Sequence, residues 1–447
     1  MPAAAALTLL SDLVARAKRA GADAADAVLV DSVSLSLGWR LGKLERLERS
    51  ESGDIGLRVL IGRRQAMVSS SDRSAAALGE LVERSIAMAR IVPEDPYAGL
   101  AESGQLARDF PDLDIVDPVE PGAEFLIDQV RRAEDAARSV PGITNSEGAD
   151  AGWGRSGVAF VASNGFAHAY DMTSGSLSVS VLAGDADGGM ERDYDFTSAV
   201  YLADLRPPEE VGHEAGRRAV HRLGARKVKT CKVPLIYDPR VSRGLIGSLA
   251  GAINGAAVAR GTSFLKDKLG ARVFAPGIRV VDDPHRHRGM RSRPCDGEGL
   301  PAKRRAVVED GVLSTWLLDL RSARQLGLDS TGHASRGTGG PPSPAATNLF
   351  LDAGPVTVDE LIGDVSRGLY VTELFGHGVN GVTGDYSRGA AGFWIENGEI
   401  TFPVSEVTVA GNLKEMFLHL TPANDLVFRH GIDAPTVRID GMTLAGR

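Results

Sequence analysis

Residues 376–413 read GHGVNGVTGDYSRGAAGFWIENGEITFPVSEVTVAGNL, and this stretch decides the fold of the C-terminal half. A loop rich in Gly, Asp, Ser and Arg leads into two apolar runs that meet at Asn397-Gly398. Both residues of an Asn-Gly pair tolerate a positive φ, so this dipeptide predicts a tight β-hairpin. The C-terminal part of the chain is therefore expected to be rich in antiparallel strands.

The patterns outside this stretch predict an α+β protein with three regions. Apolar residues at helical spacing stop at Gly21, and apolar and polar residues then alternate from Val33 to Trp39. We expect an N-terminal α+β domain with mostly antiparallel strands over 1–115 and a middle helix and antiparallel-strand region over 116–230. A β-rich C-terminal core with a buried Gly-rich helix follows over 231–447, and we expect further helices in it at Thr315–Leu326 and near Val358–Arg367. The polar run from Pro93 to Asp114 predicts a linker.

The length, net charge and cysteine count of the chain limit which classes of protein it can belong to. The chain has 447 residues, a formal net charge of −8 and 2 cysteines. The negative net charge argues against an electrostatic nucleic-acid surface, although basic residues cluster locally, and two cysteines build no disulfide framework. The N-terminus predicts a helix and no signal peptide, and the apolar stretch 244–259 is too short to cross a bilayer. We expect a cytoplasmic protein without nucleic-acid or membrane partners.

Two histidine patterns are candidates for metal binding. His213-Glu214 begins a helix whose second histidine, His221, follows eight residues later. A zinc helix needs H-E-x-x-H so that both imidazoles share a face, and this spacing does not provide that. His285 and His287 could point together, with Asp282 or Asp283 as a further ligand, but neighbouring arginines would repel a dication. We interpret this segment as a solvated loop.

The loop that opens the quoted stretch matches G-x-G-x-x-G at Gly376, Gly378 and Gly381. A dinucleotide site needs a helix directly after these glycines, and the residues that follow show no helical period. A turn that allows another backbone to approach closely is the better interpretation. Ser387, between Asp385 and Arg388, is polar enough to bind a ligand, but no general base is evident beside it.

Glycines repeat at every fourth position in the apolar helix expected over 241–259, at Gly247, Gly251 and Gly255. A glycine inside a helix costs about 1 kcal/mol against alanine, so a repeat of this kind indicates a packing or site demand. We expect this face to pack tightly, so that a leucine at Gly251 would overfill the contact.

Four segments together resemble the TldD/PmbA family of peptidase subunits. They are Thr262–Gly270, Cys295–Gly299 with its D-x-E-G turn, Asp310–Leu313, and the stretch 376–413. The resemblance covers nearly the whole chain and is weakest before residue 115.

The resemblance implies which type of subunit this is. Zinc-bearing members carry H-E-x-x-x-H on the helix that matches Leu245–Gly255, where this chain has Gly247, Ser248 and Ala252. They also place a cysteine ligand near the C-terminus, and residues 421–447 contain no cysteine. The chain thus resembles the PmbA (TldE) type, with no cofactor of its own and zinc in a TldD-type partner.

In that family the two types form a heterodimeric peptidase for unfolded or modified peptides, so the resemblance implies these partners and a possible homodimer of the chain alone. As a wall of the peptide groove we expect the loop residues Gly376, Gly378, Gly381, Gly384, Asp385, Ser387 and Arg388. The alternative function is a peptide-binding module, alone or homodimeric, without catalysis. A hydrolase using the loop of His285 and His287 is a third alternative.

Overall fold

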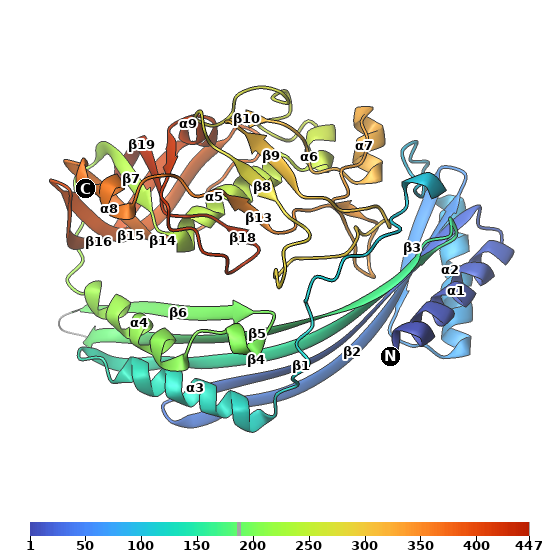
Figure 1. Cartoon of the computed structure of the whole chain (residues 1–447), viewed down its shortest axis with the longest axis horizontal. Coiled ribbons are helices and arrows are strands. Elements are labelled where there is room, and N and C mark those ends of the chain that lie inside the picture. The colour runs from blue at the N-terminus through green and yellow to red at the C-terminus, as the bar shows by residue number, and fades with distance from the viewer. Residues whose placement is uncertain (186–188, 447) are drawn as a thin grey trace.

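A long curved antiparallel sheet forms the centre of the N-terminal half of the molecule, as the computed structural model shows (Figure 1). The structure describes residues 1–185 and 189–446. The sheet has the order β3-β2-β1-β4-β5-β6. Its strands are β1 (Ala24–Arg40), β2 (Lys43–Ile61), β3 (Arg64–Ser70), β4 (Ile143–Ala162), β5 (Ala167–Asp185) and β6 (Gly189–Ala199).

The sheet is continuous across the boundary expected near residue 115. β1 pairs with β4 in antiparallel register from Asp26 opposite Ala162 to Trp39 opposite Ala149. The first two expected regions therefore contribute neighbouring strands to one sheet, and the boundaries between the three regions stay predictions.

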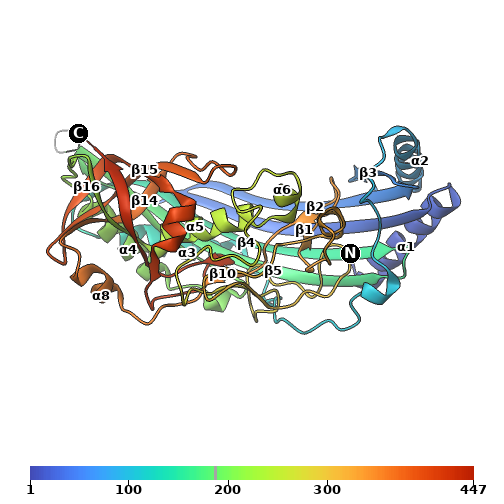
Figure 2. The ribbon, with the colours of Figure 1, turned by 90° about the horizontal axis from the view of Figure 1, so that it is seen from above.

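Four helices cover one face of this sheet: α1 (Ala3–Arg19), α2 (Ala75–Ile91), α3 (Ala123–Arg138) and α4 (Pro208–His221). Successive residues of a strand point to opposite faces, so residues of one parity in β1 meet the helices. Ala27 and Leu29 lie in the core with α1 and α2, and Leu35 and Leu37 lie in the core with α3 and α4. Figure 2 shows the strands running beyond the C-terminal half to α1 and α2.

The opposite face of the sheet meets the connecting segment 92–122 and the C-terminal half. Val28 and Phe160 pack there in a cluster that includes Cys295. The Ala107 N–H donates to the carbonyl of Gly299 at 2.8 Å. The segment expected to be a polar linker is therefore a docked layer between the two halves, and it includes a short 3-10 turn over Ser103–Gln105.

The C-terminal half contains a six-stranded sheet of order β16-β15-β14-β7-β19-β17 and a five-stranded sheet of order β10-β9-β8-β13-β18. A further pairing of β16 with β19 closes the first sheet on itself. The strands are β7 (Cys231–Tyr237), β8 (Val280–Asp282), β9 (Arg305–Glu309), β10 (Val312–Leu313), β11 (Ala334–Ser335), β12 (Ser343–Pro344), β13 (Leu349–Leu351), β14 (Arg367–Phe375), β15 (Asp385–Glu396), β16 (Glu399–Asn412), β17 (Leu420–Pro422), β18 (Ile432–Asp433) and β19 (Val437–Ala445).

The hairpin expected at Asn397-Gly398 joins β15 to β16. Asn397 has φ 52° and Gly398 has φ 81°, the left-handed values that this turn requires. With its antiparallel N-terminal sheet and β-rich C-terminal half, the fold is α+β, as predicted. Within the described residues, no helix is both long and apolar enough to cross a bilayer.

Three expected helices are shorter in the structure, and capping side chains explain two of the differences. The helix expected over 241–259 is divided into α5 (Pro239–Ala252) and α6 (Gly255–Ala259), because the Asn254 side chain accepts the N–H of Ala256 and caps a new helix. α7 (Leu320–Leu326) starts after the capping box of Asp319 instead of at Thr315. The third is α8 (Val358–Gly363), which ends before β14. A further short helix, α9, spans Leu413–Leu418.

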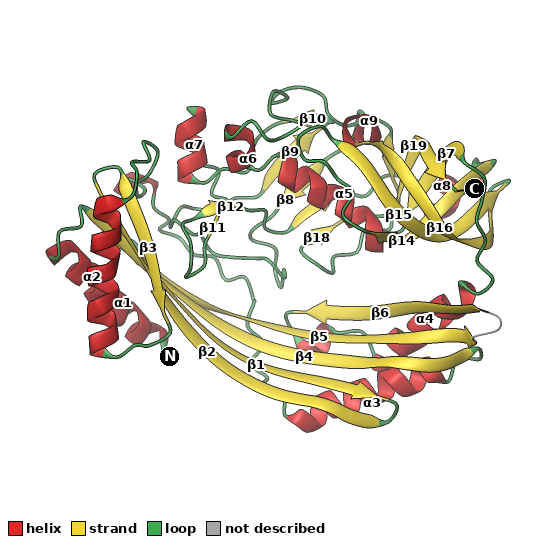
Figure 3. Cartoon of the chain, turned by 180° about the vertical axis from the view of Figure 1, so that it is seen from behind, coloured by secondary structure: helices red, strands yellow, loops and turns green. Residues whose placement is uncertain are grey.

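The expected tight packing of the glycine face is wrong at two of its three positions. α5 lies against strands of both C-terminal sheets and is buried through Leu245, Ile246 and Leu249 (Figure 3). A Cβ added at Gly247 or Gly251 would have no atom within 4 Å. The glycine stripe therefore lies on the open side of the helix, because the aliphatic residues take the buried side.

Gly255 does pack tightly. A Cβ there would lie 2.5 Å from Leu318 Cδ2 and 2.8 Å from the carbonyl oxygen of Leu317. The backbone of α6 thus approaches the segment before α7 at this one glycine.

The two environments predict opposite effects for the same substitution. Gly255→Ala should lower the free energy of unfolding by about 1–3 kcal/mol, because the new methyl group overfills the contact. Gly251→Ala should leave it unchanged or raise it by up to about 1 kcal/mol, because alanine is the better helix former. Urea unfolding of both variants tests this, and equal effects at the two positions would contradict it.

Candidate functional site

The three positions expected to replace a zinc motif all lie on α5. Gly247 and Ser248 are half-buried on its open side, and the Ser248 hydroxyl donates to the Gly244 carbonyl at 2.9 Å. Ala252 is buried, and its carbonyl accepts the Ser263 hydroxyl at 2.5 Å. The side chains at these positions are a hydrogen atom, a hydroxyl that is bonded to its own helix, and a methyl group. They provide neither imidazole nor carboxylate.

The histidine patterns do not assemble a metal site either. His285 and His287 lie in a loop after β8, as expected. The carboxylate of Asp282 is buried, where it accepts the Thr347 N–H at 2.7 Å and lies 3.3 Å from Nε2 of His333. His213 and His221 lie at separate turns of α4. Among the described residues, no cluster of three or more His, Cys, Asp or Glu side chains could hold a metal ion.

The glycine-rich loop between β14 and β15 leads into a strand, so no helix N-terminus is available for a pyrophosphate. Gly378 is the position where glycine is required, because a Cβ there would lie 1.5 Å from the carbonyl oxygen of Ser387. Gly376 and Gly384 have left-handed φ values of 74° and 86°, and a Cβ added at Gly381 would meet open space.

The polar residues of this loop are held by one another. Asp385 accepts the Thr383 hydroxyl at 2.6 Å and an Asn412 amide N–H at 3.0 Å, and these bonds lower the pKa of its carboxyl. Exposed apolar side chains flank the loop, at Phe375 and Val382. These hydrogen bonds hold the loop in place, and part of its surface is apolar. Its contact with a peptide stays a prediction.

The structure also forms a cavity that the sequence does not indicate. It has a volume of about 330 Å³ and lies where β6 and α4 meet the start of α5 and the segment before β19. A second cavity of about 200 Å³ shares part of its lining. The first is lined by Asp195, Phe196, Arg218, Asp238, Pro239, Arg240, Val358, Tyr370, Asp425, Val427, Arg429, His430, Asp433, Ala434 and Thr436. These residues come from separate segments, so no local motif could have revealed them.

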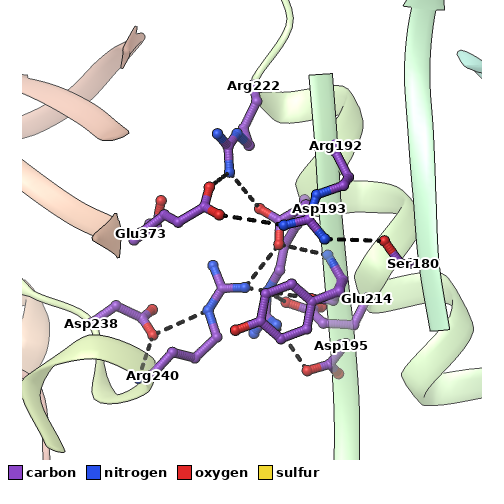
Figure 4. A network of polar contacts seen from close by, with 12 residues as sticks. Ser180, Arg192, Asp193, Asp195, Glu214, Arg222, Asp238, Arg240 and Glu373 are labelled. Carbon is purple, nitrogen blue, oxygen red and sulfur yellow. Dashed lines mark hydrogen bonds and ion pairs between the residues drawn. The ribbon is translucent and has the colours of Figure 1, made fainter. Parts of the chain in front are cut away.

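A network of ion pairs joins the N-terminal sheet to the C-terminal half beside this cavity (Figure 4). Asp193 of β6 lies at its centre, with Oδ1 2.8 Å from Nη1 of Arg240 and Oδ2 3.5 Å from Nη1 of Arg222. Arg222 also pairs with Glu373 of β14. The side chain of Asp193 is only 4% exposed and that of Arg240 10%. Charges buried to this degree are stable only when paired, so the network fixes β6 against the C-terminal half.

His430 is the histidine that lines this cavity. Its ring stacks on Phe196 with 4.9 Å between centroids. Burial, with the neighbouring cations Arg243 and Arg429, lowers the pKa of His430 to about 4. The ring is therefore neutral at physiological pH. The lining contains no serine or cysteine, and its Thr436 hydroxyl donates to Asp425 at 2.7 Å, so the cavity is suited to binding polar groups rather than to nucleophilic attack.

Removing the central carboxylate of the network should destabilise the protein strongly. Asp193→Asn is expected to lower the free energy of unfolding by about 3–5 kcal/mol, because two buried arginines lose a charged partner. Asp150→Asn is the matched control, because its pair with Arg46 is exposed, and we expect a loss of at most about 1 kcal/mol. Chemical denaturation measures both, and a small effect of Asp193→Asn would show that the network contributes little.

The lowered pKa of His430 predicts acid sensitivity of the fold. Both states carry the neutral ring above its usual pKa of 6.5, but between 6.5 and about 4 only the unfolded chain takes up the proton. Stability should therefore fall as the pH falls through this window. His430→Phe keeps the ring and cannot titrate, so its melting temperature should fall less over the same range. Parallel melting curves of the two proteins would contradict this.

Comparison with known proteins agrees with this architecture. The PmbA/TldA metallopeptidase family matches in three parts: domain 1 at residues 25–89, the central domain at 116–223 and the C-terminal domain at 230–446. Metalloprotease PmbA of Escherichia coli O157:H7 is 40% identical over 427 residues, which is 95% of this chain and 93% of that protein.

Two crystal structures share the fold over nearly the whole chain. A protein from Bacteroides thetaiotaomicron superposes with a TM-score of 0.91 at 27% identity and covers 98% of both chains. TldE from Thermococcus kodakarensis superposes with a TM-score of 0.87 at 19% identity and covers 98% of this chain and 100% of that one. The three matched domains and the PmbA relative together establish that the chain belongs to the PmbA/TldD family of metallopeptidases.

Proposed function

We propose that this chain is the non-zinc-binding subunit of a heterodimeric peptidase that degrades or processes unfolded or modified peptides. The single observation that best supports this proposal is that α5 carries Gly247, Ser248 and Ala252 at the positions of the zinc motif. A zinc peptidase needs imidazole or carboxylate ligands and a general base, and these three side chains supply none of them. The chemistry is then assigned to a zinc-bearing TldD-type partner.

In this proposal the chain contributes the peptide-binding surface. β14 extends past β7, since their pairing ends at Val371 opposite Tyr237. Residues 373–375 are paired with β15 on one side, and among the described residues no backbone pairs with their other edge. A free edge of this kind can accept an extended peptide by main-chain hydrogen bonds, which tolerate varied side chains. The loop of Gly376–Arg388 follows directly and would form the wall of the groove.

The open glycine stripe of α5 supports a role in assembly. A helix surface without side chains at Gly244, Gly247 and Gly251 lets another backbone approach closely. Since the two family types resemble each other, we expect a pseudo-two-fold heterodimer with an interface of about 2,000 Å² or more. The same surface would form a homodimer when the partner is absent. Cys231 and Cys295 are both free thiols, which supports a cytoplasmic location.

Metal analysis and peptidase assays test the proposal. The purified chain should retain no stoichiometric zinc after dialysis and should not cleave unfolded peptides. Mixing it with a zinc-bearing relative should produce chelator-sensitive cleavage that neither chain shows alone. One tightly held zinc per chain, with cleavage by this chain alone, would overturn the proposal.

A peptide-binding module without catalysis is the second candidate, and the closed, mixed-charge cavity beside Arg240 and His430 favours it. Sedimentation separates the two. A chain that stays monomeric and never associates with the zinc-bearing relative, yet binds unfolded peptide, would favour the module.

A further inference from the structure

A second region of the molecule, distant in sequence from α5, contains two arginines with buried nitrogens that have no hydrogen-bond partner in the described part of the chain. A cavity of about 100 Å³ lies where β1, β4 and β5 meet the segment 293–297 and the end of β11. Val28, Val158, Phe160 and Phe166 give it apolar walls, and the side chains of Arg293 and Arg336 also line it.

The guanidinium group of Arg336 is buried without enough acceptors. Its side chain is 2% exposed, and it lies over the Phe160 ring at 5.2 Å. Nη2 is 2.5 Å from Oδ1 of Asp26, an ion pair without hydrogen-bond alignment. Nε and Nη1 have no partner at all among the described residues. A buried N–H without an acceptor costs free energy, so a guanidinium left in this state indicates a missing partner.

Arg293 presents the same deficit to the same cavity. Its Nη1 donates to the Ala334 carbonyl at 2.8 Å, while its Nε and Nη2 are buried with no partner in the described residues. Two arginines that line one small cavity thus hold four buried nitrogens without a hydrogen-bond or ion-pair partner among the described residues.

The carboxylates nearby do not meet this demand. Asp296 also lines the cavity, but its oxygens accept the N–H groups of Glu298 and Leu300 at 2.9 Å and that of Ala334 at 3.2 Å. Asp26 is shared with Arg58, which donates to it from Nε at 3.0 Å. Burial, with the neighbouring Asp296, raises the pKa of Glu298, and one oxygen of this carboxyl accepts the Leu320 N–H at 2.8 Å. None of these carboxyl groups accepts a hydrogen bond from the four nitrogens.

We propose that Arg293 and Arg336 form a binding site for a carboxylate carried on a small apolar group. The planar forks of guanidinium groups match the two oxygens of a carboxylate. The valine and phenylalanine walls match the apolar remainder, and the volume admits a few heavy atoms. This site is separate from the peptide edge of β14 and from α5, and it does not depend on the proposed peptidase role.

A larger cavity lies beside this site. It has a volume of about 310 Å³, shares His168 and Tyr170 with the small one and is otherwise lined largely by the docked segment around Phe110. The ring of Phe110 stacks on His168 with 3.7 Å between centroids. A ligand could therefore be a free small acid or the C-terminal end of a peptide that lies in the larger cavity.

Calorimetry and thermal unfolding of the full chain test the site with butyrate as the probe. Butyrate should bind and raise the melting temperature, whereas butyramide, which has the same shape without the charge, should do neither. Arg336→Met and Arg293→Met should each raise the dissociation constant for butyrate at least about tenfold, because each removes charge-assisted hydrogen bonds. Arg293→Met keeps the pair of Asp26 with Arg58 and Arg336, so it remains informative if Arg336→Met does not fold.

Arg226→Met is the matched control, since it removes an arginine that lies over another aromatic ring, Phe402, at 4.6 Å. It should leave butyrate binding unchanged. A short apolar peptide with a free C-terminus, compared with its C-terminal amide, identifies the source: preference for the free acid indicates a peptide terminus, and butyrate binding without peptide binding indicates a small acid. No binding of either acid, or binding that neither arginine variant weakens, would overturn the proposal.

Discussion

The buried carboxylate of Asp26 is the interaction on which the join between the two halves depends. It is fully buried on β1, where it is held by Arg58 of β2 and by Arg336 of the C-terminal half. Burial alone would raise the pKa of Asp26, but the two cations outweigh it and keep the pKa below its usual value. The charge can stay in the interior only while the C-terminal half is docked.

The ion-pair network around Asp193 makes a second tie at the other end of the sheet. Between the two ties, the segment 92–122 lies against both halves and contributes backbone hydrogen bonds to each. The 330 Å³ cavity is bordered by this second tie, so its shape follows from charges placed on different segments.

α5 keeps the packing of a core helix, although it carries glycine, serine and alanine at Gly247, Ser248 and Ala252. Its aliphatic residues Leu245, Ile246 and Leu249 keep the helix between two sheets. Its open side carries almost no side-chain atoms at Gly247 and Gly251. Gly247 and Ser248 lie on the open side of the helix and Ala252 on the buried side, so the aliphatic packing does not depend on the first two positions.

Local features of this chain could be predicted because they are encoded within a few neighbouring residues. The turn at Asn397-Gly398, the helices of the N-terminal half and the absence of a helix after Gly381 follow from φ preferences and side-chain periods. The division of the helix at Asn254 and the late start of α7 at Leu320 were missed, because a single capping side chain outweighed the apolar pattern.

Only the tertiary structure decided which glycines pack, how the halves join and where the cavities lie. Gly251 and Gly255 belong to the same sequence repeat, yet one faces open space and the other meets Leu317. Asp26 and Arg336 lie far apart in the sequence and meet only when the sheet and the C-terminal half dock. The physical reason is that burial and ion pairing depend on which distant surfaces come together, and no local pattern of residues records that choice.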